Sequence, residues 1–311
     1  MINKVTNECN ISGKLYGFGR FGLKKDEKDG KIRGSIVVLT DAETQNVVEI
    51  NFLPQSPTYK SGKDNNNYTV LNEIITEEKT VEKVGEKDAI SVRVSCSLST
   101  NPYYTKQNDE YVLSEPAQIK GNFIHIDAKA KPSAVFNIDC LVQSIAPEVN
   151  FSGEETSNRI LNVQVFDDYR KLFFPLKFKM EMPEGIAFIE REYVQGESYV
   201  TLSGEIINRT VEQAPAENED MGFGERAQVN RPRTIREYLI TGGTTPREFP
   251  MDEEEMAAAR QARETFLAEA KNRAMEKNNK STTVSGFSSG SSTTSASTKT
   301  TTVKSNNKYD F

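Results

Sequence analysis

Apolar and polar residues alternate with a period of two along much of the first 212 residues. In residues 90–98, ISVRVSCSL, every second residue is apolar, so one face of an extended strand can point into a core. Segments with helical spacing are short, and the candidates are residues 68–76 and 183–192. The pattern therefore predicts a mainly β protein built from antiparallel strands.

The alternating segments fall into two sets. The first set has five strands with a candidate helix after the third, which is the order of an OB barrel. The second set has four clear strands and a candidate helix after the third, and it predicts a second OB-like barrel. The strands are predicted at residues 10–18, 34–40, 47–54, 90–98 and 117–126, and at residues 134–145, 159–167, 172–180 and 199–211.

The composition changes after the strands. Residues 213–250 are rich in Gly, Pro and charge, with one possible ordered piece at 234–240. A helix is predicted next, because acids crowd its first turn, bases its last turn, and Ala fills the middle. Its narrow apolar stripe suits docking on a partner or on the barrels, and the final segment is too polar to bury a core.

The predicted fold is thus mainly β, with two OB-like antiparallel β-barrels followed by a helix and a disordered tail. The predicted segments are barrel 1 over residues 1–128, barrel 2 over 133–212, a linker over 213–250, an α-helix over 251–277 and a disordered Ser/Thr/Asn-rich tail over 278–311.

Composition limits the function. The 311 residues have a net charge of −6, so any nucleic-acid surface has to be a local patch. The three cysteines show no C-x-x-C spacing, as expected for reduced thiols in the cytoplasm. The chain has one histidine, His125, whereas triads and most metal sites need His or clustered Cys. We therefore expect a cytoplasmic protein with no membrane span, no enzymatic activity, no cofactor and no metal.

Gly17, Gly19 and Gly22 form the pattern G-x-G-x-x-G that many nucleotide-binding loops contain. A dinucleotide site needs a helix after the third glycine, because the helix N-terminus binds the pyrophosphate. The residues that follow, LKKDEKDGKIRG, are highly charged and contain two further glycines, so no packed helix is expected there. A nucleotide-dependent enzyme is therefore the weakest interpretation.

The same segment combines aromatic and basic residues. Residues 14–33 contain seven basic and three acidic side chains, a local excess of positive charge in an acidic protein. Aromatic rings stack on bases and Lys or Arg neutralise phosphates, so the pattern favours single-stranded nucleic acid. Similar residues occur between the fourth and fifth strands and on residues 172–180. The predicted nucleic-acid-binding residues are Tyr16, Phe18, Arg20, Phe21, Lys24, Lys25, Lys31, Arg33, Tyr103, Tyr104, Lys106, Tyr111, Phe173, Lys177 and Lys179.

The segment NISGKLYGFGRFG opening a barrel, the tandem sheets, the polar tail and the terminal aromatic residue resemble the single-stranded-DNA-binding proteins of bacterial viruses. The resemblance implies binding of single-stranded DNA without strong sequence preference, during replication or recombination, in the host cytoplasm. It also implies that a C-terminal tip, Tyr309, Asp310 and Phe311, docks on replication or repair proteins. The tail departs from that group, since residues 278–311 contain four lysines and one acidic residue.

Other interpretations stay open. Charged hairpin loops are also ordinary surface features, and aromatic residues beside barrel strands are often core. The acidic net charge and the predicted helix suit a structural or adaptor protein, such as a virion or assembly component. Such a protein would bind other proteins through its sheets and self-associate through helix 252–276.

Overall fold

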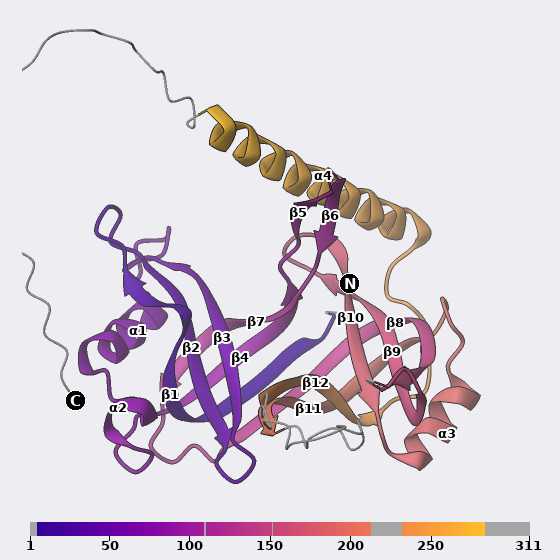
Figure 1. Ribbon diagram of the computed structural model, residues 1–311, viewed down its shortest axis with the longest axis horizontal. Helices are drawn as coiled ribbons and strands as arrows, with labels where there is room; N and C mark the ends of the chain where they lie inside the picture. Colours follow the sequence, from indigo (N-terminus) through magenta and orange to yellow (C-terminus); the bar gives the residue numbers. More distant parts are fainter. Residues whose placement is uncertain (1–4, 109, 151, 213–231, 284–311) are drawn as a thin grey trace, which may run out of the picture.

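The computed structural model describes residues 5–108, 110–150, 152–212 and 232–283 (Figure 1). The strands are β1 (Asn7–Lys25), β2 (Ile32–Asp41), β3 (Asn46–Gln55), β4 (Ser91–Thr100), β5 (Tyr103–Gln107), β6 (Glu110–Ser114), β7 (Ala117–Ile126), β8 (Ser133–Val149), β9 (Glu155–Asp167), β10 (Leu172–Met180), β11 (Tyr199–Glu212) and β12 (Pro232–Gly243). The helices are α1 (Asn66–Glu77), α2 (Val81–Val84), α3 (Pro183–Glu192) and α4 (Glu253–Thr283).

Five strands close the first barrel, in the order β1-β2-β3-β7-β4, with β4 pairing back to β1. Neighbouring strands are antiparallel except β3 and β7, which are parallel. Helix α1 lies between β3 and β4 in the sequence, and its Leu71 and Ile74 are buried in the core. Asn65 caps this helix by accepting a hydrogen bond from the Asn67 N–H at 3.1 Å. The predicted OB-like barrel is confirmed.

The second barrel repeats this order as β8-β9-β10-β12-β11, closed by the pairing of β11 with β8. Its parallel pair is β10 and β12, and α3 follows β10 as α1 follows β3. The fifth strand was not predicted, and residues 232–243 were assigned to the 213–250 linker. They form β12, which pairs with β11 along its whole length and buries Ile240 in the core. The flanking Gly, Pro and charged residues gave this segment the composition of a linker, so the strand was not recognised in the sequence.

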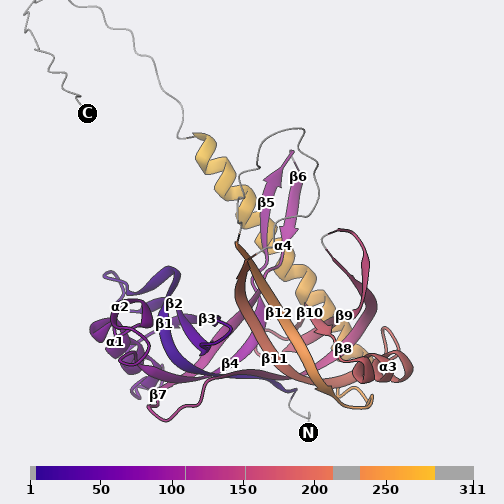
Figure 2. The same ribbon diagram turned by 60° about the horizontal axis from the view of Figure 1, so that its bottom comes forward.

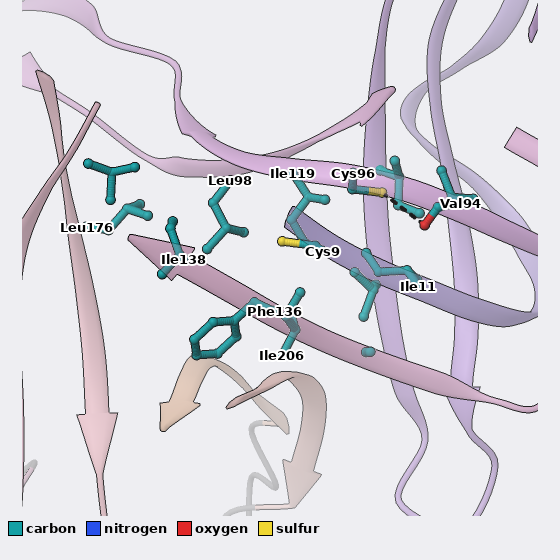
Figure 3. Close-up of a cluster of buried hydrophobic side chains, with 14 of the residues drawn as sticks. Cys9, Ile11, Val94, Cys96, Leu98, Ile119, Phe136, Ile138, Leu176 and Ile206 are labelled. Carbon is teal, nitrogen blue, oxygen red and sulfur yellow. Dashed lines mark hydrogen bonds between the residues drawn. The ribbon is translucent and has the colours of Figure 1, made fainter. Parts of the chain in front are cut away.

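The two barrels share backbone pairing and a core. Residues 9–12 of β1 pair with β4 on one side and with β8 on the other, where Cys9 lies opposite Phe136. The buried side chains of both barrels form one continuous cluster, in which Ile11 of the first barrel and Ile138 of the second both take part (Figure 3). The barrels therefore hold a fixed relative position.

Asn46 adds a polar contact between the barrels. Its buried side-chain amide donates to the Ile206 carbonyl at 2.9 Å and to Thr40 Oγ1 at 2.8 Å. Its Oδ1 accepts from the Asn208 N–H at 2.6 Å. The start of β3 is therefore hydrogen-bonded to β11.

Helix α4 packs along β10 and the β5–β6 hairpin (Figures 1 and 2). Ala259 is buried against Phe173, and Arg263 donates to the Phe173 carbonyl at 2.9 Å and pairs with Glu115 at 2.7 Å. The helix thus packs on the chain's own strands, which is one of the two kinds of docking predicted for it. The helix ends at Thr283, beyond the predicted end at 277, so the first residues of the predicted tail are helical. The rest of that tail lies outside the described residues.

The three cysteines, Cys9, Cys96 and Cys140, are buried and unpaired. Burial raises the pKa of the Cys9 and Cys140 thiols far above its ordinary value. Among the described helices, none combines the length and the apolar composition that crossing a bilayer requires.

Candidate nucleic-acid interface

A wide β-bulge in β1 places two of the predicted site residues outside the barrel wall. The β1–β2 ladder has a first irregularity between Leu15 and Gly17 and a second between Phe18 and Leu23, where residues 19–22 of β1 oppose a single residue of β2. The bulge carries Arg20 and Phe21, and Phe21 is 82% exposed. The Arg20 guanidinium lies 5.7 Å from the centre of the Phe21 ring, within the range of a cation–π contact. The chain thus presents an aromatic ring to solvent beside a cation.

Two of the G-x-G-x-x-G glycines, Gly19 and Gly22, lie in this bulge. All three lie within β1, so no helix N-terminus follows them and the pattern cannot bind a pyrophosphate in the manner of a dinucleotide fold. Gly22 has φ of 71°, a left-handed conformation that a side chain would strain. A Cβ at Gly34 would lie 1.9 Å from the Gly22 carbonyl oxygen, so glycine is needed on both strands where they approach.

The turn between β1 and β2 pairs part of the basic patch internally. Arg33 lies 2.7 Å from Asp26 and 2.6 Å from Asp29, and Lys31 lies 3.7 Å from Asp29. The hydrogen bond from Arg33 is the main cause that lowers the pKa of Asp29 to about 2. Lys31 and Arg33 were predicted as phosphate contacts, but these carboxylates already neutralise much of their charge.

Lys24 and Lys25 are exposed at the end of β1, next to the bulge. Neither forms an ion pair with a carboxylate in the described part of the chain, and Lys25 Nζ lies 5.7 Å from the centre of the Tyr68 ring. With Arg20, they place three cations within four residues of Phe21 along β1. These four side chains form the cluster that we call the bulge cluster.

Tyr16 and Phe18 lie closer to the barrel than a solvent-facing loop would place them. Both are half-buried, and Phe18 packs against the shared core. Phe18 therefore supports the wall below the bulge, and its loss affects stability as well as the surface.

The stacking surface predicted on β10 is covered. Phe173 is only 2% exposed, because α4 lies over it with Ala259. Lys177 is exposed, whereas Lys179 is half-buried. Lys179 pairs at 2.8 to 3.4 Å with three carboxylates, those of Glu148, Glu181 and Glu237. The alternation along β10 correctly predicted which side chains point away from the core of the barrel. Contacts from distant parts of the chain nevertheless bury Phe173 and neutralise Lys179.

The segment predicted as a loop between the fourth and fifth strands forms the β5–β6 hairpin. Tyr103 is 46% exposed and, together with Tyr104 and Lys106, lines a groove against α4. Tyr111 lies opposite Lys106 in the hairpin ladder. The hairpin stands out from the first barrel beside α4 (Figures 1 and 2), so these residues gather at α4 rather than at Phe21.

Two cations that the sequence interpretation missed lie where the barrels meet. Lys120 of β7 lies opposite Asn51 of β3, and its pKa is lowered by burial and, secondly, by the charge of Arg170. Arg236 of β12 lines a cleft of about 350 Å³ between the barrels, which Asn51 also lines. The possible ordered piece at 234–240 could have indicated Arg236, whereas Lys120 is recognisable only once the strand pairing is known.

Most of the chain matches one protein family. The YorF family model covers residues 6–273. The chain belongs to the YorF family. No curated protein sequence matches it.

Two solved structures are similar in layout to this YorF-family chain. One is the wild-type single-stranded DNA binding protein from Thermus aquaticus, with a TM-score of 0.43, 10% identity, and coverage of 80% of this chain and 97% of that chain. The other is a deletion mutant of the single-stranded DNA binding protein from Thermus aquaticus, with a TM-score of 0.43, 11% identity, and coverage of 81% and 98%. At this TM-score and sequence identity, residues of this chain cannot be assigned to equivalent residues of those proteins.

The predicted partner-binding tip, Tyr309, Asp310 and Phe311, lies outside the described residues. Within the described ranges, no three His, Cys, Asp or Glu side chains gather in an arrangement that could hold a metal ion.

Proposed function

We propose that this YorF-family protein binds single-stranded DNA without strong sequence preference. The observation that carries the proposal is the bulge cluster, in which the 82% exposed Phe21 lies beside Arg20 and is followed on the same strand by the exposed Lys24 and Lys25. An exposed ring can stack on any base, and each nearby cation can neutralise a phosphate. Neither interaction reads the base edges, so the binding tolerates sequence.

The position of the cluster on the fold supports the same function. OB barrels bind oligonucleotides through the face of their second and third strands and through the loops after the first and fourth strands. The bulge lies in the β1–β2 hairpin, and the β5–β6 hairpin occupies the connection after the fourth strand of the first barrel. Both connections contain aromatic and basic residues.

The proposed role is non-enzymatic. The protein protects or organises single-stranded DNA in the cytoplasm during replication or recombination, and the resemblance of its sequence to proteins of bacterial viruses suggests viral DNA. Docking of replication partners on the C-terminal tip belongs to the same proposal. The alternative role as a self-associating adaptor would use the apolar residues of α4, of which Ala270 is buried inside the chain while Phe266 and Leu267 are half-buried.

A titration of the full chain with a fluorescent thirty-residue oligo-dT tests the proposal. We expect micromolar or tighter binding that weakens steeply between about 50 and 200 mM salt, as counterions compete for the phosphates. Duplex DNA and oligo-U serve as parallel ligands that define the preference for single strands and for DNA. Absent binding, or an affinity that salt does not change, would overturn the proposed function.

A further inference from the structure

One stripe of helix α4 faces the rest of the chain. Its side chains are buried near the start of the helix, and exposed and basic near its end. Its residues follow each other at intervals of three and four, which places them on one side of a helix. Ala259 and Ala270 are buried, and between them Arg263 is fixed by Glu115. The next stripe residues are Arg273 and Lys277, both exposed. The first part of the stripe anchors the helix, and the last part points basic side chains at the β5–β6 hairpin.

A groove of about 690 Å³ separates this end of α4 from the hairpin. Its walls come from β5, from the turn between β9 and β10, and from α4. The side chains that matter for its chemistry are Tyr103, Tyr104, Lys106, Arg170, Arg273 and Lys277. We call it the hairpin–helix groove.

The charged side chains that line the groove are basic. Among the described residues, its lining contains no carboxylate. Arg273 and Lys277 form no ion pair in the described part of the chain, although Arg273 Nε donates to a backbone carbonyl of its own helix at 3.3 Å. Arg170 lies 3.8 Å from Asp167, just outside the lining, and 5.1 Å from the Phe266 ring. In a chain of net charge −6, such a surface selects a polyanion.

The groove also offers aromatic faces. Tyr103 is 46% exposed, and Tyr104 is half-buried beside it. A surface that joins exposed rings to cations matches the chemistry of a nucleic-acid single strand, whose bases and phosphates alternate at close spacing. Arg170 and Asp167 both act electrostatically on Lys120, which pairs with β3, so the turn that lines the groove lies close to the first barrel.

We propose that the hairpin–helix groove binds a second stretch of the same DNA strand that the bulge cluster binds. Tyr103 and Tyr104 stack on bases, while Arg273 and Lys277 of α4 neutralise phosphates. Helix α4 is then part of the DNA-binding surface as well as a brace for the hairpin. This inference rests on the proposed function and adds a binding element that the sequence pattern assigned to docking alone.

Two double variants of the full chain separate this role from a general effect of charge. Arg273→Gln with Lys277→Gln removes the two groove cations. Arg260→Gln with Lys271→Gln removes two exposed cations from the same helix outside the groove lining, with the same change in net charge. Gln favours helix as well as Lys and Arg do, and equal circular dichroism of both variants checks that α4 is intact.

With the thirty-residue oligo-dT, the groove variant should lose about 1.4 in the slope of log K against log salt, since each phosphate contact to a single strand contributes about 0.7. Near 0.15 M salt this corresponds to binding weaker on the order of tenfold. The control variant should stay close to the wild type. If the wild type binds and both variants share its slope, the groove inference is wrong while the proposed function stands. If the wild type does not bind, both fail.

A fluorescent reporter tests contact directly. The chain contains no Trp, so Tyr103→Trp places a single Trp in the groove. Addition of the oligo-dT should quench and shift its emission, because a base stacks on the indole. Unchanged emission at saturating DNA would contradict contact at this wall of the groove.

Discussion

Replacing Phe21 by Ala tests the bulge cluster most directly, because the ring contributes little to the folded protein. Phe21 is 82% exposed, so roughly a fifth of the ~200 Å² of an aromatic side chain is covered. At about 25 cal/mol per Å², its loss costs about 1 kcal/mol of unfolding free energy or less. A melting curve should therefore show a small shift.

The effect on binding should be larger. Stacking of one base on an aromatic ring contributes about 1 to 3 kcal/mol, as measured by substitution with Ala. The dissociation constant for the thirty-residue oligo-dT should therefore rise roughly 5- to 150-fold at 25 °C, since about 1.4 kcal/mol corresponds to a factor of ten. The salt slope should stay the same, because the substitution removes no charge.

Two controls make the result specific. Phe123→Ala removes another exposed ring, 58% exposed on β7, and should leave the affinity unchanged. Phe173→Ala removes a ring that is 2% exposed and should cost about 3 to 5 kcal/mol of stability, with little effect on DNA binding while the protein stays folded. The reasoning fails if Phe21→Ala binds like the wild type, or if Phe123→Ala weakens binding equally.

Three further variants address charge and the contact between the barrels. Lys24→Gln with Lys25→Gln should reduce the salt slope by about 1.4, and an unchanged slope would move the phosphate contacts elsewhere. Arg33→Gln should raise the pKa of Asp29 from about 2 towards its ordinary value, as followed by carboxyl NMR. Because folding lowers this pKa, the Arg33–Asp29 pair stabilises the protein above about pH 4, and the stabilisation is lost as the pH falls towards 2. The free energy of unfolding of the variant should therefore change less with pH in that window than that of the wild type. Parallel curves for the two proteins would argue against this. Asn46→Ala leaves a carbonyl and an N–H of β11 unpaired, at about 1 to 3 kcal/mol each, so urea unfolding should show a loss of at least about 2 kcal/mol, and a loss well below that would mean that water replaces the amide.

The barrel strands were largely predictable because burial on one face leaves a period of two in the sequence. That signal is local, and it failed where tertiary contacts override it. Residues 232–243 complete the second barrel, yet Gly, Pro and charged neighbours gave them the composition of a linker. Phe173 was placed correctly on the outer face of β10, but α4 returns about 90 residues later and covers it.

The candidate site was predictable in composition and not in geometry. The sequence indicated Arg20 and Phe21, while the bulge that exposes them depends on the β1–β2 register. Arg33 resembled a phosphate contact, but its partner Asp29 lies four residues earlier in the same turn. The basic end of the α4 stripe was visible in the sequence, and only the folded chain brings Tyr103 opposite to it.

The strand pairing between β1 and β8 means that the chain has no natural point of division. A fragment ending at residue 128 would expose residues 7–12 of β1 as an open edge, with unpaired N–H and C=O groups and with the apolar side chains of Cys9 and Ile11 uncovered. Such edges recruit other chains and aggregate. We therefore expect the two barrels to unfold as a single cooperative unit, with substitutions tolerated far better in their hairpins than in the strand they share.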